Sequence, residues 1–496
     1  MKRFSGLLVT VVAASVTASP ISAQLLGSPI GSTVGGIVGG TTNTLSGTVN
    51  RTVSSVAGGA RDGGASGGLA GGLQSTFTRL GGTTNSLLGG PGGTLGTVPG
   101  ALSGTLSYGA EGNGFIAAPL DRIAVPPEVS AAPPQAIADL RLARLDALVQ
   151  ANRAVLDRDP LGQPVRKREL IATNPDPVSL GLASRAGFTI LADQQETELG
   201  LRLVTLGIPR KMNVRQALVM VRRAAPALQV DYNHIYEPSG GHLLPFAGVA
   251  LAGKSSLRTV KRIAMIDGGV AAHPSLARAN IEQRGFAGDA EPTGHGTAVG
   301  SLLVGDQGPF RGAARGAELF VADVYGGNPA AGSASSILNA LSWAASKRPA
   351  VINISLVGPS NLALARAIAA VRARGIQVVA AVGNDGPAAP PQFPASYPGV
   401  VAVTGVDGLG RALPEAGRTA HLDFAAPGAD MLAAYPGQGY ATVRGTSFAA
   451  PLAAARLAMA GSYQRLTLEA RPGKGKIGRG IVCADCRTDP RLARPK

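Results

Sequence analysis

The second half of the chain contains an apolar stretch that ends in a glycine pair, Lys261-Arg262-Ile263-Ala264-Met265-Ile266-Asp267-Gly268-Gly269. Its apolar run ends on two glycines, a pattern that indicates a buried β-strand followed by a tight turn. Asp267 therefore stands at the carboxyl end of a strand, where ligands and catalytic groups gather in open α/β sheets. Considered alone, Asp267 is better interpreted as an ordinary aspartate in a turn.

A second candidate is His295, which lies in Gly294-His295-Gly296-Thr297. The apolar run 298–304 follows, so the motif reads as the start of a helix. A glycine on each side of the histidine lets other backbone approach the imidazole closely. The chain has five histidines, and the other four lack such a setting.

A third candidate is Asn384, in the motif Gly383-Asn384-Asp385-Gly386 that follows an apolar strand predicted at residues 377–382. Asparagine at the end of a strand is most often a turn former. Its side-chain amide can equally donate to an oxygen that gains negative charge during a reaction.

The fourth candidate is Ser447, in Arg444-Gly445-Thr446-Ser447-Phe448-Ala449-Ala450-Pro451. A tight turn precedes this serine, and an alanine-rich helix through Ala460 follows it. The hydroxyl would stand at a helix N-terminus, where backbone amides favour negative charge. The alternative is a simple N-cap serine.

Together the four residues supply an acid, a base, an amide donor and a nucleophile, in the chain order Asp, His, Asn, Ser. Serine is a poor nucleophile near neutral pH unless a neutral imidazole takes its proton. The imidazole in turn needs a buried carboxylate that holds its tautomer and stabilises the cation. The conjunction is therefore far more specific than any of its parts.

Residues from about 240 to 460, a little under half of the chain, resemble a subtilisin-like serine protease, a subtilase. Besides the motifs already quoted, the matching segments are Val270 with His273-Pro274, Val351-Ile352-Asn353-Ile354-Ser355-Leu356, Pro387, and Ala426-Pro427-Gly428. The resemblance implies an α/β fold, a parallel sheet with helices on both faces, in a peptidase domain at residues 240–465. It also implies endopeptidase activity through an acyl-enzyme, with Asp267 as orienter, His295 as general base and acid, and Ser447 as nucleophile. Asn384 and the backbone amide of Ser447 are the implied oxyanion hole.

Residues 165–239 are predicted to form a separate small unit. Strands are expected at 170–173, 188–191, 201–206 and 228–236. One helix is expected at 177–184, and Asn213 is expected to cap a second helix that runs to Ala224. The order β-α-β-β-α-β predicts a compact two-layer α+β sandwich. This unit resembles the propeptide of subtilases, an intramolecular inhibitor and folding aid whose end lies across the active site. The resemblance implies self-cleavage between Tyr236 and about Phe246.

Two features depart from the family pattern. Ser355, Leu356, Val357 and Gly358 are the strand expected to pair with extended substrate, and valine stands at 357 where the family usually has glycine. Its branched side chain would either narrow the primary specificity pocket or turn this edge away. The loop at residues 304–310 holds one carboxylate, whereas a strong calcium site needs several oxygen ligands. No calcium, other metal or cofactor is predicted.

The chain has 496 residues, and its N-terminal part differs in composition from the rest. Residues 1–23 read as a signal peptide, because Lys2 and Arg3 precede an apolar run that ends in small residues. Residues 24–118 are rich in glycine, serine and threonine, which predicts a flexible linker, with an adhesive or assembly segment as the alternative.

A Pro-rich linker and a charged helix are expected at residues 119–164. The helix is predicted within 135–158, where leucine and isoleucine recur at helical spacing. The residues on its apolar face are Ile137, Leu140, Leu142, Leu145 and Leu148.

The last segment, residues 466–496, is a basic tail in a chain whose formal net charge is +16. Cys483 and Cys486 are the only cysteines. Because export implies an oxidising compartment, a small disulfide ring is favoured over a redox or metal site. A solvated tail is favoured over a nucleic-acid contact, since the tail has no aromatic residue on which bases could stack.

The sequence thus predicts an exported serine endopeptidase, secreted, periplasmic or on the cell surface. Its partners would be protein or peptide substrates and its own propeptide module, with no specific nucleic acid. No apolar run beyond the signal is long enough to span a bilayer, so no transmembrane anchor is predicted. The alternatives are an inactive protease-like binding protein and a surface or adhesive protein whose segment 24–118 does the main work.

Overall fold

The computed structural model describes residues 133–239, 242–246, 261–328, 330–437 and 439–493. The predicted signal peptide at 1–23 and the glycine-rich segment at 24–118 lie outside the described residues. So do the first residues of the predicted linker at 119–164. None of the helices in the described ranges is long and apolar enough to cross a membrane.

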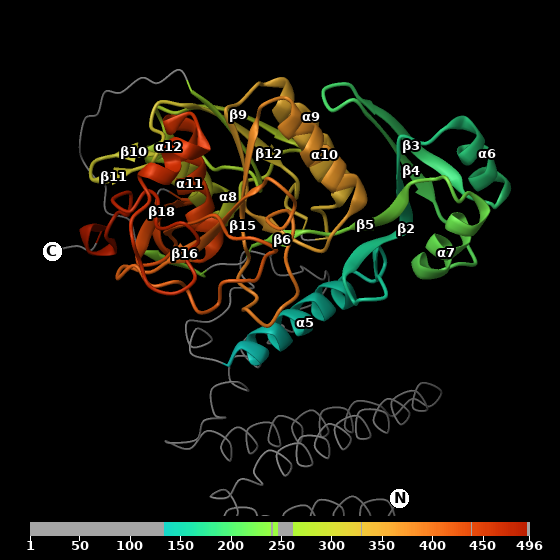
Figure 1. The fold of residues 1–496 in the computed structure, drawn as a ribbon, viewed down its shortest axis with the longest axis horizontal. Helices are drawn as coiled ribbons and strands as arrows, with labels where there is room; N and C mark the ends of the chain where they lie inside the picture. The colour runs from blue at the N-terminus through green and yellow to red at the C-terminus, as the bar shows by residue number, and fades with distance from the viewer. Residues whose placement is uncertain (1–132, 240–241, 247–260, 329, 438, 494–496) are drawn as a thin grey trace, which may run out of the picture. The chain divides into compact units, whose positions relative to one another are not determined.

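Seven parallel strands form the central sheet, in the spatial order β17-β16-β15-β13-β8-β12-β9. In chain order they are β8 (Arg262–Asp267), β9 (Asn280–Gly285), β12 (Glu318–Asp323), β13 (Val351–Ile354), β15 (Gln377–Ala381), β16 (Val401–Val406) and β17 (Phe424–Pro427). Strands β8 and β12 pair in register, with Asp267 opposite Asp323. The predicted parallel α/β sheet is confirmed (Figure 1).

Helices cover both faces of this sheet. They are α8 (Gly294–Val304), α9 (Ala334–Ser346), α10 (Leu362–Ala373), α11 (Thr446–Ala460) and α12 (Tyr463–Leu468). Alternate residues of β8 point to opposite faces, as in any strand. Ile263 and Met265 join one core with α8 and α11, while Ala264 and Ile266 join the other with α9 and α10.

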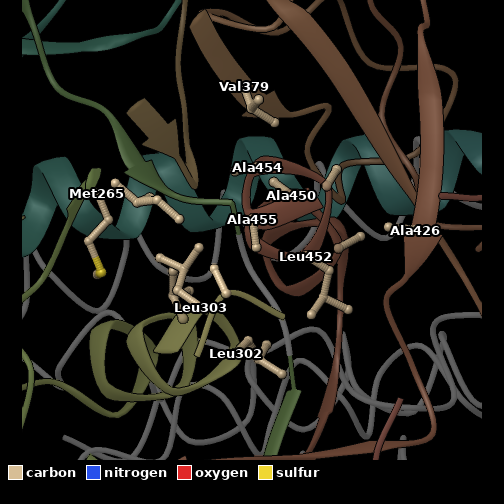
Figure 2. Packing of buried hydrophobic residues seen from close by; sticks show 14 of the residues in the cluster. Met265, Leu302, Leu303, Val379, Ala426, Ala450, Leu452, Ala454 and Ala455 are labelled. Carbon is tan, nitrogen blue, oxygen red and sulfur yellow. The ribbon is translucent and has the colours of Figure 1, made fainter. Parts of the chain in front are cut away.

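The core that contains α11 depends on small side chains. Figure 2 shows Ala450, Ala454 and Ala455 of this helix, with Met265, Leu303 and Val379 in the same cluster. Because an alanine side chain is one methyl group, the helix backbone lies close to the sheet. This packing holds in place the helix whose second residue is the candidate nucleophile Ser447.

Short strands lie outside the central sheet. They are β6 (Glu237–Pro238), β7 (His242–Phe246), β10 (Asp306–Gln307), β11 (Phe310–Arg311), β14 (Leu356–Val357), β18 (Met431–Tyr435) and β19 (Gly439–Arg444), with 3-10 helices at Pro274–Leu276 and Pro490–Ala493. Strand β19 pairs with β7 and β18 and leads directly into α11.

The small unit has the predicted order of elements. These are β2 (Pro164–Thr173), α6 (Pro177–Arg185), β3 (Thr189–Glu196), β4 (Leu201–Gly207), α7 (Val214–Ala224) and β5 (Val230–His234). Strand β2 pairs with β4 and β5, and β4 with β3, all antiparallel. Asn213 caps α7 as expected, in a reciprocal capping box with Gln216. The unit has a hydrophobic core of its own.

The helix predicted within 135–158 is shorter than expected. Helix α5 runs over Pro134–Ala151, and Leu156–Arg158 instead form strand β1, which pairs with Pro164–Arg166. Ile137, Leu145 and Leu148 are buried as predicted, whereas Leu142 is 51% exposed and does not belong to the buried face. Arg141 is buried on that face instead.

The expectation of a solvated tail is wrong for part of residues 466–496. Leu466, Val482 and Cys483 belong to the main core, and Ile481 forms a bridge with Ala425 of β17. The basic residues Lys474 and Lys476 are exposed. The sulfur atoms of Cys483 and Cys486 lie at disulfide distance, with Cα atoms 5.2 Å apart.

Candidate active site

Asp267 ends β8 at the carboxyl edge of the sheet, as predicted. Its carboxylate is fully buried. Oδ1 accepts a hydrogen bond from the backbone N–H of Gly268 at 2.8 Å and lies 2.8 Å from Nδ1 of His295. A buried carboxylate in this position holds the imidazole in one orientation and leaves Nε2 free to take a proton.

His295 lies in the first turn of α8, which Thr293 caps through its side-chain oxygen to Gly296 N at 2.9 Å. A Cβ atom at Gly268 would clash with the side chain of Thr293. Glycine at the turn after Asp267 therefore allows the close approach that brings the two elements together. The imidazole is 4% exposed.

Ser447 is the second residue of α11, and the cap position belongs to Gly445. The alternative reading as an N-cap serine is therefore wrong. The ring of Phe448, the next residue, lies 5.3 Å from that of His295, centroid to centroid. In the described part of the chain, neither Ser447 Oγ nor His295 Nε2 has a hydrogen-bond partner. These are the two atoms between which a triad would pass its proton.

Asn384 lies beside the start of α11. Its Oδ1 accepts a hydrogen bond from the backbone N–H of Thr446 at 2.9 Å, which orients the amide group. Its Nδ2 donates to the backbone carbonyl of Ser239. The side chain therefore does more than form a turn, because it binds a carbonyl that comes from the far end of the small unit.

The comparisons with known proteins identify a family for the second half of the chain. The Peptidase S8 subtilase family matches residues 259–470. Subtilisin Savinase of Lederbergia lenta is 35% identical over 206 residues, which are 40% of this chain and 75% of that protein. The chain belongs to the subtilase family. It is accordingly a subtilisin-like serine protease, a hydrolase.

Other relatives of this subtilase cover different shares. The major intracellular serine protease of Bacillus subtilis is 30% identical over 44% of this chain and 73% of its own length. The alkaline protease of Alkalihalobacillus alcalophilus is 35% identical, and the match spans 53% of that protein. Among solved structures, fervidolysin from Fervidobacterium pennivorans has a TM-score of 0.54 at 19% identity, over 65% of this chain and 61% of that one. That likeness concerns the fold alone.

In this subtilase the end of the small unit lies along the strand expected to pair with substrate. Glu237 and Pro238 of β6 pair antiparallel with Val357 and Leu356 of β14. The N–H of Ser239 donates to the carbonyl of Ser355 at 2.9 Å. Val357 therefore does not turn the edge away, which was one of the two effects expected from this departure.

Tyr236 anchors the same segment at its start. Its N–H donates to Gly332 O at 2.9 Å, and its hydroxyl donates to Pro359 O at 2.7 Å. Its ring lies against Gly358, where an added Cβ would be 2.5 Å from the ring atom Cδ1. Gly358, the last of the four predicted substrate-binding residues, thus provides the room for this ring.

Tyr325 also binds this segment, a role that was not predicted from the sequence. Its hydroxyl donates to the carbonyl of Tyr236 at 3.0 Å. Burial first, and then the nearby Asp267 carboxylate, raise the pKa of Tyr325 well above the ordinary value, so the hydroxyl keeps its proton. No motif marks Tyr325 or Gly332, and only their position near the carboxyl end of β12 could have suggested a role.

No group of three or more His, Cys, Asp or Glu side chains within the described ranges is placed to hold a metal ion.

Proposed function

We propose that this subtilase is an exported serine endopeptidase that cuts its own chain between Ser239 and Gly240. Ser447 Oγ attacks the carbonyl carbon while His295 Nε2 takes the hydroxyl proton, and Asp267 stabilises the imidazolium. His295 then gives that proton to the leaving amine. The acyl-enzyme on Ser447 is hydrolysed by water, with His295 again acting as the base.

The observation that carries this proposal is the hydrogen bond from Asn384 Nδ2 to the carbonyl oxygen of Ser239. An oxyanion hole donates to the oxygen of the bond that is cut. The bond that follows this carbonyl joins Ser239 to Gly240. This choice narrows the expected interval from Tyr236 to about Phe246 to one peptide bond.

The pairing of residues 235–239 supports a propeptide role for the unit at 165–239. One side of the segment pairs with β14, and on the other side Ile235 forms a bridge with Ser333. Backbone pairing of this kind binds an extended peptide as an added strand. A module whose last residues, 235–239, occupy the substrate position in this way inhibits the enzyme until this segment is cut from the peptidase domain and released.

The experiment is mass spectrometry of the protein secreted by its source or an export host, wild type beside Ser447→Ala. We expect removal of residues 1–23 in both proteins and a fragment that begins at Gly240 only in the wild type. Wild-type protein that stays uncut, or a Ser447→Ala protein that is cut at the same bond, would refute self-processing.

The binding-protein alternative is tested separately with a serine-reactive fluorophosphonate probe. An active protease is labelled at Ser447, and the label is lost in His295→Ala. An unlabelled wild-type protein, after the N-terminal module has been removed, would favour a binding role. Deletion of residues 24–118 tests the adhesive alternative, which requires loss of surface retention while peptide hydrolysis continues.

A further inference from the structure

Helix α5 contacts both the segment 235–239, which pairs with β14, and the loop that follows Asn384. Near its start, Ile137 packs on Gly386, where an added Cβ would lie 3.1 Å from Ile137 Cβ. Near its end, Leu148 and Val149 share a buried cluster with Ile235. The helix therefore reaches from the loop that follows Asn384 to Ile235, at the start of the segment 235–239.

Two arginines in the middle of α5 form ion pairs with the loop that follows Asn384 and with the segment 235–239. Arg141 Nε lies 2.9 Å from Asp385 Oδ2, and Arg144 Nη2 lies 3.1 Å from Asp385 Oδ1. The same Arg144 nitrogen lies 3.0 Å from Glu237 Oε2. Asp385 follows the proposed oxyanion donor directly, and Glu237 lies two residues before the proposed site of cleavage.

This network of two arginines and two carboxylates is buried. Arg141, Asp385 and Glu237 are each at most 4% exposed. Burial lowers the pKa of Arg144, but the Glu237 and Asp385 carboxylates outweigh it and hold the pKa above the usual arginine value. Removal of one partner from such a network leaves an uncompensated buried charge, which is far more costly than the loss of a surface ion pair.

The helix is also tied to the small unit, so that the two would leave the enzyme together. Arg141 Nη2 donates to Gln163 Oε1 at 2.9 Å. Strand β1, which follows the helix, pairs with the first residues of β2. Both elements precede the β-α-β-β-α-β unit in the chain and add to the surface through which it contacts the peptidase domain.

We propose that α5 is a second inhibitory element, and that Asp385 is its docking point on the enzyme. Through Arg141 and Arg144 the helix holds the segment 235–239 against the peptidase domain, so that the module stays bound after the Ser239–Gly240 bond is cut. The helix thereby sets when activity appears. This inference rests on the proposed self-processing and concerns the step that follows it.

The test follows the full-length chain as wild type and as the double variant Arg141→Met, Arg144→Met. Methionine keeps much of the apolar stem and removes the charge. Cleavage is followed on a denaturing gel, association of the two fragments by size-exclusion chromatography, and activity with a fluorogenic peptide. In the wild type we expect the fragments to co-elute and activity to lag behind cleavage.

In the double variant we expect cleavage at the same bond but separation of the fragments at a protein concentration about 100-fold higher than in the wild type. The lag before activity should shorten accordingly. The kcat/KM of the separated C-terminal fragment should equal that of the wild type, because α5 is absent from both. Fragments that co-elute as in the wild type, with an unchanged lag, would overturn the proposal.

Arg153→Met is the matched control. This arginine lies just past the end of α5 and is exposed, so its loss should leave the lag and the co-elution unchanged. A shortened lag in this variant would show that any loss of N-terminal charge is enough, and would overturn the role of the network. Arg144→Lys keeps a charge but not the planar guanidinium, so its lag should be shorter than that of the wild type and longer than that of the double variant.

A separate measurement distinguishes failure of this inference from failure of self-processing. If the wild-type chain is never cut, self-processing is refuted, and the fluorophosphonate probe then reports access to Ser447 in the intact chain. Labelling at least about 10-fold faster in Glu237→Gln or in the double arginine variant would support α5 as an inhibitory element. Equal labelling rates in all three proteins would overturn it.

Discussion

The side-chain amide of Asn384 donates a hydrogen bond to the backbone carbonyl of Ser239. The two residues are far apart in the chain, and the bond joins the peptidase domain to the end of the small unit. Thr446 N donates to the other end of the same amide at 2.9 Å. The residue before the proposed nucleophile thus orients the group that binds the proposed scissile carbonyl.

Asn384→Ala should lower kcat for peptide hydrolysis by about 100- to 1000-fold with little change in KM. The amide is expected to bind the oxygen more strongly once it becomes an oxyanion, so its loss affects the transition state most. Steady-state kinetics of the separated C-terminal fragment would measure both constants. A loss confined to KM would mean that Asn384 binds substrate without stabilising the transition state.

Gly358→Ala should slow self-cleavage at least about 10-fold, because the added methyl group overlaps the ring of Tyr236 and a packed site tolerates such overlap poorly. Tyr236→Ala in the same chain should recover part of the rate, since it removes the ring that clashes. The measurement is the rate at which the cut fragment appears on a gel. A double variant slower than Gly358→Ala alone would show that the two residues do not compete for this space.

The chain should lose stability steeply above pH 10. Burial raises the pKa of Tyr397 to about 12, and the pKa values of Tyr236 and Tyr325 are raised as well. Below pH 10 these phenols are protonated in both states. Between pH 10 and 12 the unfolded chain loses protons that the folded chain keeps, so the free energy of unfolding falls as pH rises.

Tyr397 alone should account for about 2 to 3 kcal/mol of that loss. Tyr397→Phe is expected to be less stable at pH 8, because the hydroxyl donates to Asn361 O at 2.9 Å, but to lose less on the way to pH 12. Urea unfolding in a Ser447→Ala background avoids self-digestion. Parallel pH profiles for the two proteins would contradict the assignment.

The Cys483–Cys486 pair should be oxidised in the exported protein and should contribute at most about 2 kcal/mol, because it closes a very short loop. Alkylation of the denatured chain should modify no thiol before reduction and two after it. Replacement of both cysteines with serine should leave peptide hydrolysis intact. Two alkylated cysteines without reductant would show that the bond does not form.

The fold and the positions of the four candidate residues in it could be predicted, because each residue lies at the end of a local pattern. Asp267 ends one apolar strand and Asn384 follows another, while His295 and Ser447 lie in the first turns of helices, so a parallel sheet brings all four to one edge. The helix cap at Asn213 is equally local, and the end of its helix at Ala224 was predicted correctly. In these cases the order of residues alone specifies the position.

What could not be predicted depends on contacts between distant segments. Arg141 looks like a surface residue in the sequence, and its buried charge is paired with Asp385, which lies 244 residues later in the chain. The helix ends before residue 156 because Leu156–Arg158 find a partner in β2. Val482 is buried against a core made mainly by residues far earlier in the chain, so a basic composition gave the wrong expectation for its surroundings.

The segment 235–239 precedes the Ser239–Gly240 bond, and strand β7 follows it in the same chain. While that bond is intact, the module cannot diffuse away, and its effective concentration at the cleft does not depend on how dilute the protein is. After the cut, the same contacts hold two separate molecules, and dilution works against them. The proposed cleavage would thus convert inhibition that is independent of protein concentration into inhibition that depends on it. The cut enzyme would become active where its own concentration is low and stay inhibited where that concentration is high.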